Sequence, residues 1–213
     1  MDRQANIKPV FRTSNQVAVT DVLFTLMYQY ISIVSLGGFM QHLTKSELLS
    51  LLKAARAESE RDWLMILVAF WHGLRASEVT GLTRANVRDG HLTVQRLKGS
   101  LKTVQPLVSH DDPLLDERRA LQVAVADLPA RGKVFGISRV QFFRLMQKYC
   151  QAAGIPSHKA HPHVLKHTVA MQTIQKAGIE NVRQYLGHKS IASTGAYLRV
   201  NDSQASAAVQ GVL

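Results

Sequence analysis

The chain has 213 residues, 46% of them hydrophobic, with 26 lysines and arginines against 15 aspartates and glutamates and a formal net charge of +11. This length supports one well-buried domain and is short for two. The cationic excess predicts a polyanionic partner, with nucleic acid as the first choice and a generic or ribosomal-type basic protein as the alternative. The single cysteine, Cys150, excludes an intrachain disulfide and a multi-cysteine metal cluster, which fits a reducing cytosol.

The first forty residues differ from the rest of the chain in their pattern of charged and apolar residues. Residues 1–19 are polar and mixed in charge, which predicts a flexible basic arm without the regions of a signal peptide. Residues 22–41 carry no formal charge and are about as long as a minimal membrane span. Polar residues dilute this stretch and its apolar residues recur at helical spacing. We therefore favour a helix packed on the domain or on a neighbouring subunit over membrane insertion.

The compact domain is predicted to start near residue 43. Thr44 and Glu47 have the Thr-x-x-Glu spacing of a capping box, and a leucine-rich periodic segment follows them. A second helix is expected from Arg61 to Gly73; it is too apolar for a surface element and is therefore central. Gly73 suits the turn that ends this helix.

The remaining pattern is mixed but mostly helical. Residues 91–96 and 103–108 read as two short strands, joined by a glycine-bearing turn with Lys98 near its tip. Helical periodicity resumes in residues 113–126, 138–153, 162–177 and 181–186. Cys150 falls on an apolar-periodic stretch, which predicts a buried thiol. The fold class is thus mainly α with a small antiparallel β-sheet, and we expect an N-terminal arm and apolar helix (1–42), a catalytic domain (43–200) and a C-terminal tail (201–213).

Four short motifs follow one another in the chain: HGLRASEV at residues 72–79, LKG at 97–99, HPHVLKHT at 161–168 and LGH at 186–188, with Tyr197 after the last. They resemble the catalytic boxes of tyrosine recombinases, the phage integrase family, over residues 43–200. Each residue alone has an ordinary structural explanation, so the order and spacing carry the resemblance. It implies the catalytic-domain fold of that family. Fimbrial phase-switch invertases, a compact form lacking most of the N-terminal core-binding domain, have similar HGxRASE and RLK boxes.

Three of these residues suit a phosphodiester clamp. Arg75 offers a planar fork of donors that stays charged and can bridge two phosphate oxygens. His163 and Lys166 lie three residues apart in a predicted helix, so both can reach the same phosphate. Neither an acidic cluster of magnesium type nor a recognisable zinc motif is present in the sequence, which disfavours a metal-dependent nuclease.

The other three residues suit strand cleavage. Lys98, on its hairpin, is a candidate general acid for the departing 5′ hydroxyl. His188 is expected to hydrogen-bond the phosphate or to orient the nucleophile, and Tyr197 is the candidate nucleophile. The resemblance implies a covalent 3′-phosphotyrosyl intermediate and no metal, ATP or other cofactor. His161 and His167, which flank the third motif, are expected to be structural caps or second-sphere donors.

Lys166 departs from the family pattern, which usually has arginine at this position. Lysine keeps the charge but loses the bidentate geometry. We hypothesise a native variation that supports slow or partner-dependent recombination. The alternative function is a catalytically weak or inactive DNA-binding protein that occupies recombination sites. A type IB topoisomerase shares the chemistry, but the size of the chain and the residues that make up its motifs favour a recombinase.

The expected partner is double-stranded DNA. The resemblance alone implies a homotetramer on synapsed DNA and accessory DNA-bending proteins. With no room for a full DNA clamp, we expect subunit contacts through residues 22–39 or through the tail after residue 200. The expected location is the cytoplasm, in association with the nucleoid, with no role for a membrane.

Overall fold

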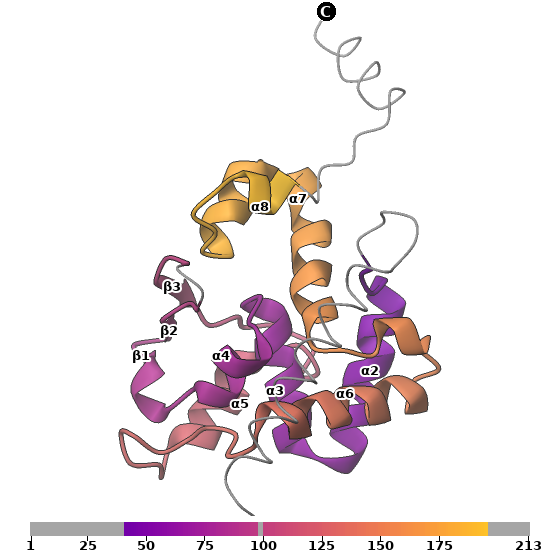
Figure 1. Cartoon of the computed structure of the whole chain (residues 1–213). Helices are drawn as coiled ribbons and strands as arrows, with labels where there is room; N and C mark the ends of the chain where they lie inside the picture. The colour runs from indigo at the N-terminus through magenta and orange to yellow at the C-terminus, as the bar shows by residue number, and fades with distance from the viewer. Residues whose placement is uncertain (1–40, 98–99, 196–213) are drawn as a thin grey trace, which may run out of the picture. The chain divides into compact units, whose positions relative to one another are not determined.

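The computed structural model describes residues 41–97 and 100–195, and helices form most of this part of the chain (Figure 1). The helices are α2 (Lys45–Glu58), α3 (Glu60–Trp71), α4 (Ala76–Gly81), α5 (Glu117–Val125), α6 (Arg139–Ala152), α7 (His163–Tyr185) and α8 (Ala192–Gly195), with 3₁₀ turns at Arg84–Asn86 and Ser157–Lys159. The strands are β1 (Val87–Arg88), β2 (His91–Val94) and β3 (Thr103–Pro106). This composition confirms the predicted fold class.

The capping box predicted at the start of α2 is present. The Thr44 hydroxyl accepts a hydrogen bond from the Glu47 N–H at 3.1 Å, and the Glu47 carboxylate accepts one from the Thr44 N–H at 2.7 Å. Two backbone donors that the helix itself leaves unpaired are thereby satisfied. The Leu43 N–H also donates to the buried Thr168 hydroxyl at 2.9 Å, which fixes the entry to α2 against α7.

Helix α3 is the centre of the core, as its apolar sequence predicts. Every residue from Trp63 to Phe70 is buried, and α3 contacts α2, α4, α5 and α7. Gly73 follows the helix with φ +56°, the left-handed conformation that lets the chain turn sharply. A Cβ at this position would lie 2.5 Å from Leu186 Cδ2, so glycine also permits the close approach of residues 72–75 to the end of α7.

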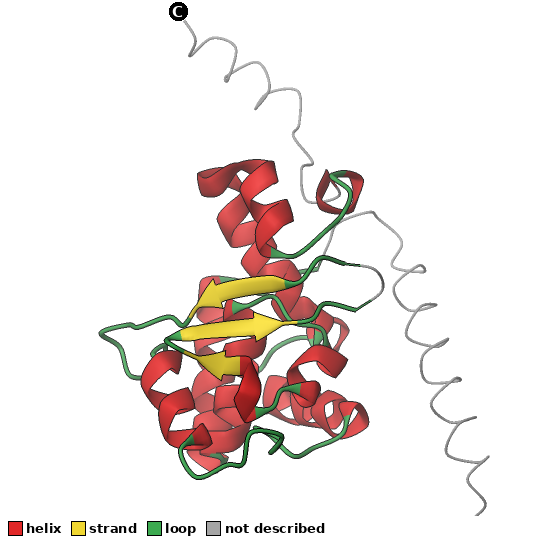
Figure 2. Cartoon of the chain, turned by 90° about the vertical axis from the view of Figure 1, so that its left-hand side faces the viewer, coloured by secondary structure: helices red, strands yellow, loops and turns green. Residues whose placement is uncertain are grey.

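The three strands form one antiparallel sheet in the order β1-β2-β3 (Figure 2). Leu92 pairs with Gln105 and Val94 with Thr103, while Leu92 and Val94 point into the core. Both predicted strands are present, each two residues shorter than expected at its end. Strand β1 was not predicted; it pairs with β2 through a tight turn at Asp89 and Gly90, both at positive φ. Asp-Gly is a strong hairpin signal, and β1 is too short to show alternation.

Helix α5 begins later than its sequence pattern suggests. The helix expected from residue 113 starts at Glu117, with the Asp116 side chain capping the Arg119 N–H. The carbonyls of Leu114 and Leu115 instead accept hydrogen bonds from the indoles of Trp63 and Trp71, at 3.0 and 3.1 Å. These contacts with α3 hold the segment in a turn.

Helix α7 is interrupted at Gly178, where the sequence predicted two separate helices. Gly178 has φ 77° and ψ 161°, so the chain turns between residues 163–177 and the short helix that ends at Tyr185. Figure 1 shows α7 extending away from α2 and α6 toward α8. Cys150 on α6 is fully buried, as predicted.

Within residues 41–97 and 100–195, no helix is both long and apolar enough to cross a membrane. The uncharged residues 22–40 lie outside the described part of the chain.

Candidate active site

The structure brings together three of the six predicted site residues. Arg75 is the N-cap residue of α4, Lys166 lies in the first half of α7, and His188 follows the turn after α7. The charges of Arg75 and Lys166 both influence the pKa of His188. His163, half-buried, is the first residue of α7, and its ring centroid lies 5.8 Å from that of His167.

The two remaining predicted residues, Lys98 and Tyr197, lie outside the described residues. Both flanks of the loop that contains Lys98 are nevertheless tied to the cluster. The Leu97 N–H donates to Glu78 Oε1 at 3.0 Å, and the Leu101 N–H donates to the Gly187 carbonyl at 2.9 Å. Residues 98–99 therefore connect two points that are each anchored to a motif of the site.

Arg75 is held at one edge of its guanidinium. Nη1 donates to Glu78 Oε1 at 2.9 Å, and the Arg75 backbone N–H donates to Glu78 Oε2 at 2.9 Å. A weaker contact joins Nη1 to the Leu97 carbonyl at 3.5 Å. Among the described residues only Nη1 is engaged, which leaves Nε and Nη2 to bind an anion. The side chain is 19% exposed and thus open to a ligand.

Glu78 is the buried anion that organises this edge of the site. Burial by itself would raise the pKa of Glu78, but hydrogen bonds from the Arg75 and Leu97 N–H groups and the charge of Arg96 outweigh it, so the pKa is lowered. Glu78 is therefore a carboxylate. It fixes both Arg75 and the strand that leads to Lys98.

Lys166 is buried, and its amine forms no ion pair with any of the described residues. The residue is 4% exposed, and Nζ has no hydrogen-bond partner among the described residues. Burial, followed by the charges of Arg75 and Arg96, lowers the pKa of Lys166 to about 7 against the opposing effect of Glu78. An unpaired buried ammonium is costly, so its site is suited to an anion that supplies the missing partner.

His188 lies beside this cation. It is 7% exposed, and its Nδ1 lies 3.0 Å from the Thr194 hydroxyl on α8. Burial and the surrounding positive charges, first that of Lys166, lower the pKa of His188 to about 4. The imidazole is therefore neutral at physiological pH, with Nδ1 engaged by Thr194 and Nε2 left to contact a ligand.

His161 and His167 differ from the cluster in environment. The Val164 N–H donates to His161 Nδ1 at 3.2 Å, a capping contact at the start of α7 of the kind expected from the sequence. Burial lowers the pKa of His161 to about 4 and that of His167 to about 3. Both rings are neutral and sit at the start of the helix that carries Lys166.

Sequence reasoning missed Arg96 and Glu78 as parts of the site. Both are buried, and Arg96 Nη1 lies 3.3 Å from Glu78 Oε2. A signal was present: alternation along the second strand places Arg96 on the same side as the buried Leu92 and Val94. A buried arginine requires acceptors, which a search among neighbouring motifs could have supplied.

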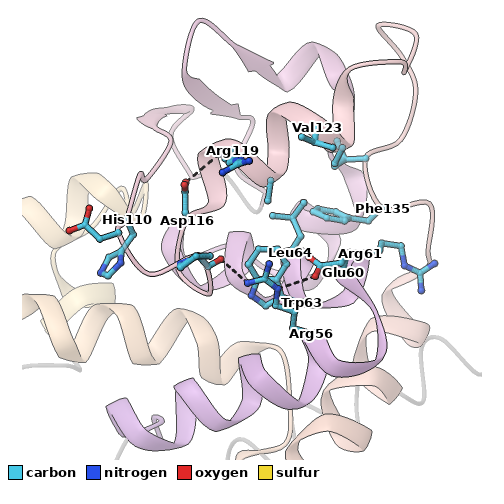
Figure 3. Close-up of a pocket in the computed structure, with 15 residues that line it drawn as sticks. Arg56, Glu60, Arg61, Trp63, Leu64, His110, Asp116, Arg119, Val123 and Phe135 are labelled. Carbon is cyan, nitrogen blue, oxygen red and sulfur yellow. Dashed lines mark hydrogen bonds and ion pairs between the residues drawn. The ribbon is translucent and has the colours of Figure 1, made fainter.

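A cavity of about 760 Å³ lies away from this cluster, between the start of α3, helix α5 and residues 110–113 (Figure 3). Trp63, Leu64 and Phe135 contribute apolar surface, and three arginines and three carboxylates also line it. None of the predicted site residues that the structure describes, Arg75, His163, Lys166 and His188, lines this cavity. The cationic cluster therefore remains the candidate site.

The model of the phage integrase family matches residues 41–204, and the chain belongs to this family. A tyrosine recombinase from Pseudothermotoga lettingae is 29% identical over 178 residues, which cover 80% of this chain and 60% of the relative. The type 1 fimbriae regulatory protein FimE from Escherichia coli is 28% identical over 180 residues, which cover 76% of this chain and 86% of FimE.

Solved structures share the fold. The crystal structure of XerA recombinase superposes with a TM-score of 0.65 at 22% identity, over 83% of this chain and 64% of XerA. A lambda integrase tetramer bound to a Holliday junction gives a TM-score of 0.56 at 21% identity, over 70% of this chain and 47% of the integrase. The architecture described above is thus that of a tyrosine recombinase catalytic domain.

Proposed function

We propose that the protein is a site-specific DNA recombinase that cleaves and rejoins strands through a covalent 3′-phosphotyrosyl intermediate at Tyr197. The observation that carries the proposal is the buried Nζ of Lys166, which lacks a partner among the described residues and faces the charges of Arg75 and Arg96. Cationic side chains that converge on one point are what a phosphodiester in its transition state requires.

Each proposed role follows from the chemistry of its residue. Arg75 bridges two phosphate oxygens with its free guanidinium edge, and Lys166 places a positive charge against the same group. His163, three residues before Lys166 on α7, adds a donor. The neutral His188 donates from Nε2 to a phosphate oxygen, since Thr194 engages Nδ1.

Lys98 and Tyr197 complete the proposed reaction. Tyr197 loses its phenolic proton to solvent, its oxygen attacks phosphorus and the bond to the 5′ oxygen breaks, with Lys98 donating the proton to that leaving group. The phosphotyrosyl bond preserves the energy of the broken linkage, so the 5′ hydroxyl of another strand can reverse the step. The anchoring of Leu97 and Leu101 supports Lys98 in this role.

Double-stranded DNA is the proposed partner, with a homotetramer on synapsed sites and accessory bending proteins. The net charge of +11 supports DNA binding. The lambda integrase tetramer on a Holliday junction is a precedent for the assembly on a shared fold. We propose residues 43–200 as the catalytic domain, after an arm and apolar helix (1–42) and before a tail (201–213), acting in the cytoplasm at the nucleoid.

Covalent trapping tests the chemistry. Nicked duplexes that span the ends of the element carrying this coding sequence are incubated with wild type and with Tyr197→Phe in EDTA, and adducts that resist denaturation are resolved by electrophoresis. Tyr185→Phe is the matched control, since the Tyr185 hydroxyl donates a hydrogen bond to the Trp71 carbonyl at 2.8 Å. We expect an adduct in wild type and Tyr185→Phe and none in Tyr197→Phe. Loss of the adduct in Tyr185→Phe alone would assign the nucleophile elsewhere.

A second candidate function is DNA binding without efficient cleavage. The observation that favours it is Lys166, because lysine supplies a single charge point where arginine would supply a fork. Sequence-specific binding by wild type without an adduct, together with an adduct in Lys166→Arg, is the result expected of this second function.

A further inference from the structure

Arg96 is the most densely bonded side chain around the site, yet the proposed reaction gives it no role. It follows β2, is 2% exposed, and uses all three nitrogens of its guanidinium group as donors. A buried arginine with every nitrogen engaged has little freedom to contact a substrate. Its function must be exerted through the groups that it holds.

Those groups belong to three separate elements of the site. Nη2 donates to the His72 carbonyl at 2.8 Å and Nη1 to the Gly73 carbonyl at 3.1 Å, at the turn that leads directly to Arg75. Nε donates to the Thr103 hydroxyl at 3.0 Å, across the base of the hairpin that carries residues 98–99.

The third element is the end of α7, which leads to His188. Arg96 Nη2 lies 3.4 Å from the Tyr185 carbonyl, and Gln105 Nε2 donates to the same carbonyl at 2.9 Å. Gln105 Oε1 in turn accepts from Arg96 Nη2 at 3.3 Å. Arg96 and Gln105 thus link the sheet to the last turn of α7 through hydrogen bonds to one carbonyl.

We propose that Arg96 is a positioning residue that sets the geometry of strand cleavage by tying the turn before Arg75, the base of the β2–β3 hairpin and the turn before His188 to a single guanidinium group. This inference rests on the proposed function. Close packing leaves little tolerance: a Cβ on Gly187 would lie 3.0 Å from Arg96 Cγ and 2.8 Å from the Leu101 carbonyl. A planar fork can satisfy carbonyls in several directions at once, whereas an ammonium cannot match that geometry.

Arg96 acts on the site through its positive charge as well as through its hydrogen bonds. These two effects can be measured separately. Among the described residues, the charged or titratable groups that interact with Lys166 are Arg75 at the start of α4, Glu78 on α4, Arg96 after β2, His167 on α7 and His188 after α7. Arg96 is among the causes that lower the pKa of Lys166. A neutral replacement should raise that pKa, while a lysine replacement should preserve the charge and lose the fork.

The test compares Arg96→Met and Arg96→Lys with the control Arg88→Met, which removes an exposed arginine from β1 of the same sheet. Single-turnover cleavage of nicked DNA at saturating protein gives the rate, and fluorescence anisotropy gives DNA affinity. Protein labelled with ¹³Cε-lysine reports the titration of Lys166, assigned by its absence in Lys166→Arg. Thermal melting monitors folding.

We expect both Arg96 variants to lose about a hundredfold in cleavage rate, the effect of displacing reacting groups by about 1 Å, with affinity changed less than about threefold. The pKa of Lys166 should rise in Arg96→Met and stay near its wild-type value in Arg96→Lys. Arg88→Met should match wild type in rate and titration. If Arg96 had only a structural role, both variants would lower the melting temperature. The cleavage rate would then not fall more than DNA affinity, and the pKa of Lys166 would not differ between Arg96→Met and Arg96→Lys.

Cleavage by Arg96→Lys at the wild-type rate would overturn the proposal, because charge alone would then suffice. A rate for Arg96→Met within threefold of wild type would also overturn it. If Arg96→Met does not fold, Arg96→Lys decides the question. Failure of wild type to cleave would refute the proposed function and leave the positioning role to a second measurement. That measurement compares the amide resonances of Gly73 and Gly187 in DNA-free wild type and Arg96→Lys. Unchanged resonances would overturn the positioning role.

Discussion

Lys166→Met should make the protein more stable and eliminate its cleavage activity. The folded state lowers the pKa of Lys166 from 10.5 to about 7, so the unfolded chain binds more protons between these values. Stability therefore rises with pH across this window, and the full penalty of the buried ammonium applies below about pH 7. Linkage gives a penalty of about 4 kcal/mol at pH 7 and about 2 kcal/mol at pH 9.

Methionine has a similar length and no charge to bury, so Lys166→Met should recover most of this penalty. Urea unfolding at pH 7 and pH 9 measures it: the variant should exceed wild type by about 4 kcal/mol at pH 7 and by about half as much at pH 9. Lys176→Met, an exposed change on α7, should alter stability at neither pH. Equal stability of Lys166→Met and wild type at pH 7, or a difference that does not narrow at pH 9, would refute the reasoning.

Three further predictions concern the same cluster. DNA affinity of wild type should fall as pH rises above about 7, by up to about tenfold per pH unit, because phosphate binding requires protonated Lys166; Lys166→Arg should remove this dependence in anisotropy titrations from pH 6 to 9. Gly187→Ala should cost about 1–3 kcal/mol in urea unfolding, since φ is +69° and the added Cβ would lie 2.8 Å from the Leu101 carbonyl. Glu78→Gln should lower single-turnover cleavage about a hundredfold, because Arg75 loses its anchoring charge; an unchanged rate would contradict the role of Glu78.

Local signals in the sequence were sufficient for most helices. The capping boxes at Thr44 and Ser138 and the turn at Gly73 mark helix ends through contacts within a few residues, so the pattern alone locates them. The start of α5 was misjudged for the opposite reason. The carbonyls of Leu114 and Leu115 bond to indoles 51 and 44 residues earlier in the chain, which no local pattern reveals.

For the candidate site, too, the sequence identified some features and the tertiary structure supplied others. Motif order in the sequence identified Arg75, His163, Lys166 and His188 as candidates, and the structure places three of them in one electrostatic cluster. The roles of Lys98 and Tyr197, which lie outside the described residues, stay predictions.

The sequence by itself determined the family, the helical class and the set of candidate residues, because these depend on residue types and short spacings. Only the tertiary structure decided that Lys166 is a buried cation without a partner among the described residues and that Arg96 joins three elements of the site. The burial of Lys166 and the hydrogen bonds of Arg96, which reach a residue 89 positions away, depend on how the chain packs. They set the protonation of Lys166 and the geometry around Arg75, which spacing along the chain does not specify.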